Sequence, residues 1–139
     1  LAAAEATLDA VMERPGIFAE VESIGRRLMD LLTSIAATYD VSQYVHAAGQ
    51  PARHCWKFRD AEAVTARDLL ALFQQKMCEH RVLAGVTNCP TICHGELEMG
   101  IITTALDNAL LSLKQAIADQ DITRHLAGPT PRALYVRPS

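Results

Sequence analysis

Five residues suited to chemistry by type lie close together in the second half of the chain: Cys78, His80, Cys89, Cys93 and His94. Thiolates and imidazoles are ligands that zinc prefers in a tetrahedral site, and a thiol near a histidine is the pairing of a cysteine nucleophile with its base. The spacing favours neither chemistry, because no two cysteines form a Cys-x-x-Cys pair and the side chains of adjacent residues usually point apart. We therefore expect buried or incidental cysteines in a reducing compartment, and no metal.

The composition fits one domain of moderate size. The chain has 139 residues, of which 50% are apolar, and a net charge of -3. This small charge gives no electrostatic basis for binding nucleic acid or an anionic membrane. The apolar runs are far shorter than the roughly 20 residues of a membrane-spanning helix, and no segment has the pattern of a signal peptide. A soluble, cytoplasmic protein is expected.

The side chains of these cysteines and histidines must be positioned by helices and strands. Apolar residues at helical spacing predict four helices: 1–12, 17–38, 65–80 and 95–118. The first helix ends before Pro15, because proline cannot continue a helix. The third begins at Thr65, which lies three residues before Asp68 as in a capping box.

Alternating apolar and polar residues predict two strands, 44–49 and 54–59, that pair antiparallel across a short turn. Trp56 and Phe58 share the face expected to be buried. Two more short strands are predicted at 82–84 and 90–93. The whole is therefore an α+β domain, with a small antiparallel or mixed sheet of three to four strands covered by helices.

The order of several segments between Trp56 and Lys114 is similar to that of a known family. The segments are Trp56-Lys-Phe-Arg-Asp, Leu69-Leu-Ala-Leu-Phe-Gln-Gln-Lys-Met, Val82-Leu-Ala-Gly and His94-Gly-Glu-Leu-Glu. This succession resembles the C-terminal small domain of class III pyridoxal-phosphate aminotransferases, and within them the glutamate-1-semialdehyde 2,1-aminomutase type. The likeness covers residues 1–117 as a pattern over a long span. It implies the small domain of a fold-type I enzyme that works as a homodimer.

The start of the chain agrees with such a fragment. Its first residues are typical of a helix interior and lack the Ser, Thr, Asp or Asn that usually caps a helix. We expect a linking helix at 1–14, severed from a missing large domain, then the small domain at 15–118 and an irregular tail at 119–139. Within the tail, the apolar residues 134–136 are expected to pack on the body.

The resemblance also implies what this chain lacks. Pyridoxal phosphate is held by a lysine as a Schiff base, with an acid against its pyridine nitrogen, and in the family both groups belong to the large domain upstream of Leu1. Lys57, Lys76 and Lys114 lie in no matching context and are expected to be ordinary solvated lysines. The intact enzyme would transfer an amino group between an amino acid and an oxo compound. The fragment itself is expected to be inactive, with no catalytic or cofactor-binding residue.

Some family members bind a substrate carboxylate through an arginine just before the last helix. Residues 86–90 contain no arginine, which argues against an ornithine-type substrate and is compatible with the aminomutase branch. Thr87 and Asn88 are the candidates for lining the substrate entrance, and both also suit an ordinary turn. The implied partners are the large domain of the same polypeptide, a small amino-acid substrate and a second copy of the enzyme.

An interpretation of a different class remains open: a freestanding interaction or oligomerisation module with the shape of this small domain. The helix at 17–38 would then bury its apolar stripe against a partner chain. The uncapped start at Leu1 favours the enzyme fragment. The reading frame upstream of Leu1 distinguishes the two.

Overall fold

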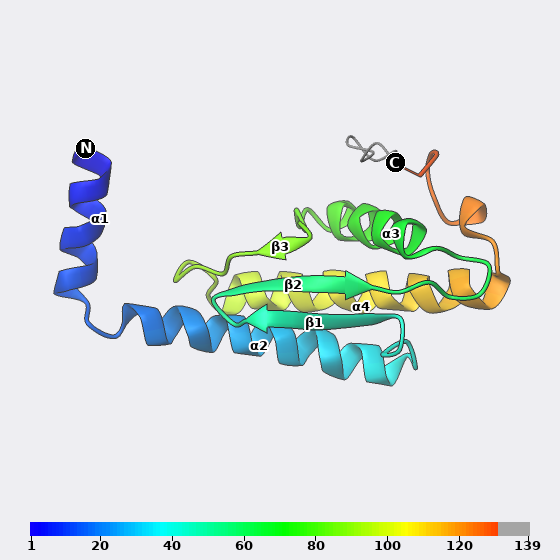
Figure 1. Cartoon of the computed structure of the whole chain (residues 1–139), viewed down its shortest axis with the longest axis horizontal. Helices are drawn as coiled ribbons and strands as arrows, with labels where there is room; N and C mark the ends of the chain where they lie inside the picture. Colours follow the sequence, from blue (N-terminus) through cyan, green and yellow to red (C-terminus); the bar gives the residue numbers. More distant parts are fainter. Residues whose placement is uncertain (131–139) are drawn as a thin grey trace, which may run out of the picture.

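The computed structural model describes residues 1–130 and has an α+β architecture, as the sequence predicted. A three-stranded antiparallel sheet in the order β1-β2-β3 is accompanied by four α-helices (Figure 1). Along the chain the elements are α1 (Ala2–Glu13), α2 (Ile17–Thr38), β1 (Val45–Gln50), β2 (Arg53–Phe58), α3 (Ala66–Glu79), β3 (Thr87–Asn88), α4 (Glu96–Asp119) and a 3-10 turn, η1 (Ile122–Arg124).

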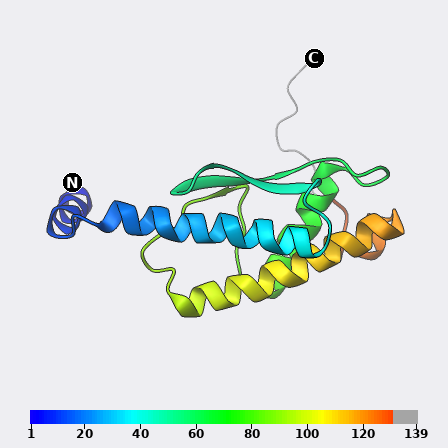
Figure 2. The same ribbon diagram turned by 90° about the horizontal axis from the view of Figure 1, so that it is seen from below.

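Helices α2, α3 and α4 lie on one side of the sheet (Figure 2). The strand residues that face them are buried, Val45 on β1 and Trp56 on β2, whereas Lys57 on the alternate face is exposed. The predicted hairpin is confirmed, with Ala47 opposite Trp56. Strands β1 and β3 form the two edges of the sheet. The fold is thus a helical layer packed on one face of a small sheet.

The core lies where α3 and α4 pack against each other beneath β2. Phe73 on α3 is fully buried at its centre. The ring centroid of Phe73 lies 5.0 Å from that of Trp56, edge to face, and 5.3 Å from that of Phe58. The largest fully buried aliphatic side chains around it are Leu32, Leu69, Leu72, Met77, Leu106, Leu110 and Leu113. Edge-to-face aromatic pairs of this kind stabilise a core beyond the area that they bury.

Helix α2 approaches the β1–β2 turn through a glycine. Gly25 is buried, and a β-carbon at this position would overlap the backbone carbonyl of Pro51. The same carbonyl oxygen lies 3.0 Å from Nδ1 of His54. Only glycine lets the helix backbone come this close to the turn.

The start of α3 is fixed by the predicted capping box. The backbone N–H of Asp68 donates to the Thr65 hydroxyl, and the Asp68 carboxylate accepts from the backbone of Thr65. A third partner comes from the end of the described chain, where the Thr130 hydroxyl donates to Asp68 at 2.5 Å. The hydrogen bonds from Thr130 and then from Thr65 lower the pKa of Asp68 below its usual value.

The Asp68→Asn variant is expected to lose about 1 kcal/mol of the free energy of unfolding at pH 7, because the charged acceptor in the capping box is gone. A lowered pKa in the folded state means that the carboxylate stabilises the fold above its ordinary pKa and that this contribution disappears as pH falls through the folded value. The difference between wild type and variant should therefore shrink below about pH 4. Urea denaturation across pH measures it. Asp30→Asn, an exposed control on α2, should leave the free energy of unfolding at pH 7 nearly unchanged.

The strand predicted at 82–84 is wrong. The backbone reverses at Arg81, where φ is 63°, and the Val82 N–H donates to the carbonyl of Met77. The carbonyl of Ala84 accepts from the side chain of Gln74. Because these backbone groups bond to α3, strand pairing begins only beyond Gly85, at Thr87–Asn88.

The edge strand predicted at 90–93 is also wrong, because these residues form a turn. The backbone N–H of Cys93 donates to the Thr91 hydroxyl, and that of His94 to the Thr91 carbonyl. Pro90 has no N–H to offer a sheet.

The tail beyond α4 is fastened to α3. The Gln75 side-chain amide donates to the His125 carbonyl at 3.2 Å and accepts from the Ala127 N–H at 2.8 Å. The tail includes the short turn η1 and is otherwise irregular up to Thr130. Residues 134–136, which were expected to pack on the body, lie outside the described part of the chain.

Helix α1 stands apart from the rest of the structure (Figure 1). None of its 12 residues is buried against other described residues. Leu8 and Met12 leave 64% and 78% of their surface exposed. Among residues 1–130, no helix combines the length and the apolar character needed to cross a bilayer.

Candidate functional site

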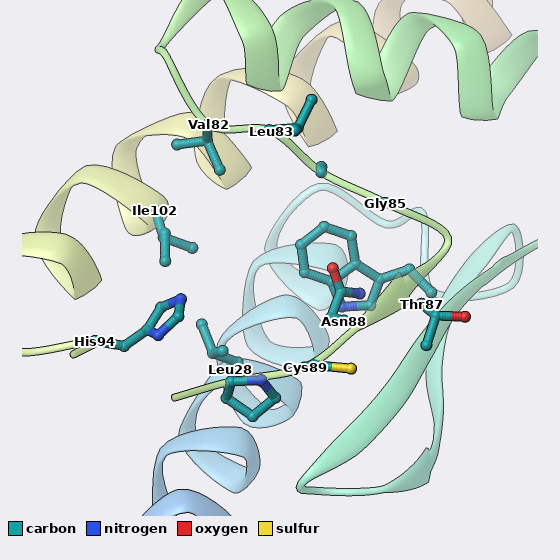
Figure 3. A pocket seen from close by; sticks show the side chains of 12 residues that line it. Leu28, Val82, Leu83, Gly85, Thr87, Asn88, Cys89, His94 and Ile102 are labelled. Carbon is teal, nitrogen blue, oxygen red and sulfur yellow. The ribbon is translucent and has the colours of Figure 1, made fainter. Parts of the chain in front are cut away.

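A pocket of about 190 Å³ lies between β3, the segment that follows α3, and helices α2 and α4. Leu28 of α2 and Ile102 of α4 form apolar walls, together with Val82 (Figure 3). Trp56 of β2 and Asn88 of β3 belong to the wall formed by the sheet. The pocket therefore lies between the sheet and the helical layer, at the end of the sheet where β3 pairs with β2.

Local backbone contacts hold the pocket wall in place. The N–H of Trp56 donates to the carbonyl of Val86, which extends the β2–β3 pairing by one hydrogen bond. Gly85 makes the tight turn before β3, since a β-carbon there would lie 2.9 Å from the carbonyl oxygen of Thr87. The wall is thus fixed by a glycine turn on one side of Val86 and by strand pairing on the other.

The structure separates the two residues that the sequence proposed for the substrate entrance. In β3, Thr87 lies opposite Cys55 and Asn88 opposite His54, so their side chains point to opposite faces of the sheet. Both residues line the pocket, but the Thr87 hydroxyl lies 3.6 Å from the sulfur of Cys55 on the other face of the sheet. The amide of Asn88 points into the pocket (Figure 3).

Three buried nitrogen atoms on the helical side of the sheet have no hydrogen-bond partner among the described residues: His54 Nε2, Trp56 Nε1 and Asn88 Nδ2. Strand register places them together, because Asn88 is opposite His54 and Trp56 is two residues along β2. The rings of His54 and Trp56 have centroids 6.2 Å apart. A buried polar group without a partner costs roughly 1–3 kcal/mol. Trp56 and Asn88 are lining residues of the pocket, but their nitrogens have almost no accessible surface and are therefore shielded from it.

Sequence reasoning placed Trp56 on a buried face but did not assign it to a site. The sequence gives only a weak signal for a site at Trp56, since a tryptophan on a strand is most often part of the core. What identifies its role is the register that sets Asn88 near it, which depends on the pairing of β3 with β2.

Of the cysteines and histidines considered for metal or nucleophile chemistry, only Cys89 and His94 line this pocket. Nδ1 of His94 lies 3.1 Å from the backbone nitrogen of Thr91, and its ring points into the pocket (Figure 3). Cys93 is exposed on the preceding turn, and Cys78 is exposed rather than buried beside the α3 stripe. Within residues 1–130, no three His, Cys, Asp or Glu side chains come together in a group that would hold a metal ion.

Charged side chains lie outside the pocket. Lys57 and Lys114 are exposed, and the ammonium of Lys76 is 2.9 Å from the Glu79 carboxylate. Near the pocket, Arg27 and Glu96 join α2 to α4 at 2.9 Å. Their hydrogen bond raises the pKa of Arg27 and lowers that of Glu96, but both groups are exposed, so the pair adds little stability.

No family model, curated protein or solved structure matches the chain.

Proposed function

We propose that this chain is the C-terminal small domain of a class III pyridoxal-phosphate aminotransferase or aminomutase, similar to the glutamate-1-semialdehyde aminomutase type. The intact cytoplasmic enzyme moves an amino group between an amino acid and an oxo compound, or between adjacent carbons of one substrate. The observation that carries the proposal is the order of elements. A long helix, an antiparallel hairpin, a capped helix, a short strand and a final helix follow one another. The quoted segment Val82-Leu-Ala-Gly lies in the connection before the short strand rather than on it.

The state of α1 supports the same proposal. It is an amphipathic helix whose apolar residues, Leu8 and Met12 among them, are exposed over most of their surface. A large domain of the same polypeptide would cover them, as expected for a linking helix. The α2 stripe that a freestanding module would offer to a partner packs instead within this chain, where Leu28 and Leu32 are buried.

The chain's own residues do not fit the cofactor. Lys57 and Lys114 are exposed, Lys76 is ion-paired with Glu79, and none of the three lines the pocket beside Asn88. Pyridoxal phosphate would supply an electron sink to the intact enzyme, held by groups of the large domain. The expected part of this domain is to close over the cofactor cleft and shape the substrate entrance.

The complete reading frame that encodes this chain tests the proposal. We expect it to contain a large domain upstream of Leu1, and the purified product to carry pyridoxal phosphate that borohydride fixes to one upstream lysine. The chain of residues 1–139 mixed with pyridoxal phosphate should give no stoichiometric adduct. A start codon next to Leu1 would support the freestanding module instead. An adduct at Lys57, Lys76 or Lys114 would contradict the assignment of the lysine to the large domain.

A further inference from the structure

The face of the sheet that the helices leave uncovered is positively charged (Figure 2). Arg53 and Lys57 lie on this face of β2, on either side of Cys55, and both are exposed. Among residues 1–130, neither forms an ion pair. The three strands contain no aspartate or glutamate. The acid nearest to Lys57 along the chain, Asp60, accepts from the backbone N–H of Ala66 at the start of α3.

Small residues make up the middle of this face. The register places Ala48 opposite Cys55 and Cys55 opposite Thr87, so the three form a strip across the strands. The distance between packed elements depends on the size of the side chains at the contact. A helix can therefore come close to the sheet over this strip, between the charges of Arg53 and Lys57.

Helix α1 carries the complementary charge. Glu5, Asp9 and Glu13 recur every four residues, so they form one stripe along the helix, and α1 contains no lysine or arginine. All three are exposed, and none forms an ion pair with a described residue. Ala2 and Ala6 lie three residues before Glu5 and Asp9, on the same side of the helix. This side of α1 is therefore acidic and otherwise small.

Helix α1 also lacks a surface that stabilises it. It has 12 residues, none of them buried, and it stands beyond the end of its own sheet (Figure 1). Isolated helices of this length are only marginally stable in water. A surface of opposite charge on another molecule would supply the missing contact.

The spacing of the charges on α1 fits that on β2. Glu5 and Glu13 are eight residues apart, which is about 12 Å along a helix. Arg53 and Lys57 are four residues apart, which is about 13 Å along a strand. A helix α1 laid along β2 therefore brings the two outer acids of its stripe to the two bases.

We propose that the uncovered face of the sheet binds α1 of a second copy of this chain, with the acidic stripe of one copy against Arg53 and Lys57 of the other. In a twofold-symmetric dimer each copy gives one helix and receives one. Leu8 and Met12 lie on the neighbouring side of α1, which stays available to the large domain of the proposed enzyme. The inference goes beyond the proposed function and does not depend on it.

Sedimentation velocity of the chain of residues 1–139 tests the dimer. A monomer–dimer equilibrium that depends on protein concentration is expected. Raising the salt from about 0.1 M to about 1 M shortens the Debye length from about 10 Å to about 3 Å and should weaken the dimer at least about tenfold. A chain that stays monomeric at all concentrations up to about 1 mM would overturn the proposal. A dimer whose affinity salt does not lower would overturn it as well.

Two charge-reversal variants identify the surfaces. One carries Glu5→Lys, Asp9→Lys and Glu13→Lys on α1, and the other carries Arg53→Glu and Lys57→Glu on β2. Each variant alone should dimerise at least about tenfold more weakly than wild type, because like charges then face each other. Mixed in equal amounts, the two should form a heterodimer, because both contacts again join opposite charges.

The matched control reverses the same number of charges as the β2 variant on the helical layer. Arg67→Glu with Lys114→Glu changes exposed residues of α3 and α4 and should leave dimerisation unchanged. All reversed positions are exposed, so folding should be retained, which circular dichroism checks. Reversal variants that dimerise alone as tightly as wild type would overturn the proposal, as would a mixture of the two that does not associate.

Discussion

The Gly25→Ala variant is expected to lose about 3 kcal/mol of the free energy of unfolding. The added methyl group would overlap the carbonyl of Pro51, so α2 and the β1–β2 turn cannot keep their present separation. Both partners are backbone, and no side-chain rotation relieves the overlap. Displacement of the turn would also disturb the contact between Pro51 and His54. Urea denaturation measures the loss.

Gly100→Ala is the matched control for this prediction. Gly100 also lies inside a helix, α4, but no atom would come within 4 Å of a β-carbon there. Alanine at an open helical position should stabilise the protein by about 0.5–1 kcal/mol. The two substitutions are therefore expected to have opposite signs. A Gly25→Ala variant as stable as wild type would mean that α2 does not approach the turn as closely as described.

The Phe73→Ala variant is expected to lose about 3–5 kcal/mol, because it removes the ring at the centre of the core and leaves a cavity. Phe73 contacts both Trp56 and Phe58, so the loss should also change the fluorescence of the single tryptophan. Denaturation followed by that fluorescence measures both effects.

Phe18→Ala provides the corresponding control. Phe18 is of the same type but 69% exposed at the start of α2, and its removal should change stability by no more than about 0.5 kcal/mol. Similar losses in the two variants would show that Phe18 is covered in solution and that the core is not centred on Phe73.

The helices could be predicted closely because their signals are local. The apolar stripe of α2 and the capping box of α3 each depend on residues only a few positions apart in the sequence. Both helices begin and end within one residue of the predicted bounds. The β1–β2 hairpin follows from alternation and a short turn, which are local as well.

The third strand could not be predicted, because its position depends on contacts between distant residues. The segment from Val82 to Ala84 is apolar like a buried strand. Its backbone groups bond to α3 instead, because the Val82 N–H donates to the Met77 carbonyl and the Ala84 carbonyl accepts from the Gln74 side chain. The pocket depends in turn on the register of β3, which brings Asn88 beside Trp56 although the two are far apart in sequence. The aminotransferase assignment stays a prediction that the upstream reading frame will test.

The position of β1 at the rim of the sheet has a consequence for the behaviour of the protein during refolding. Along its outer side, the strand Val45–Gln50 hydrogen-bonds to no other described strand, and it carries none of the lysines or prolines that commonly deter pairing between copies. Its six-residue length is ordinary for a strand and gives no protection, and the backbone is irregular only at Gly49, where φ is 106°. Concentrated refolding solutions should therefore aggregate first through this rim.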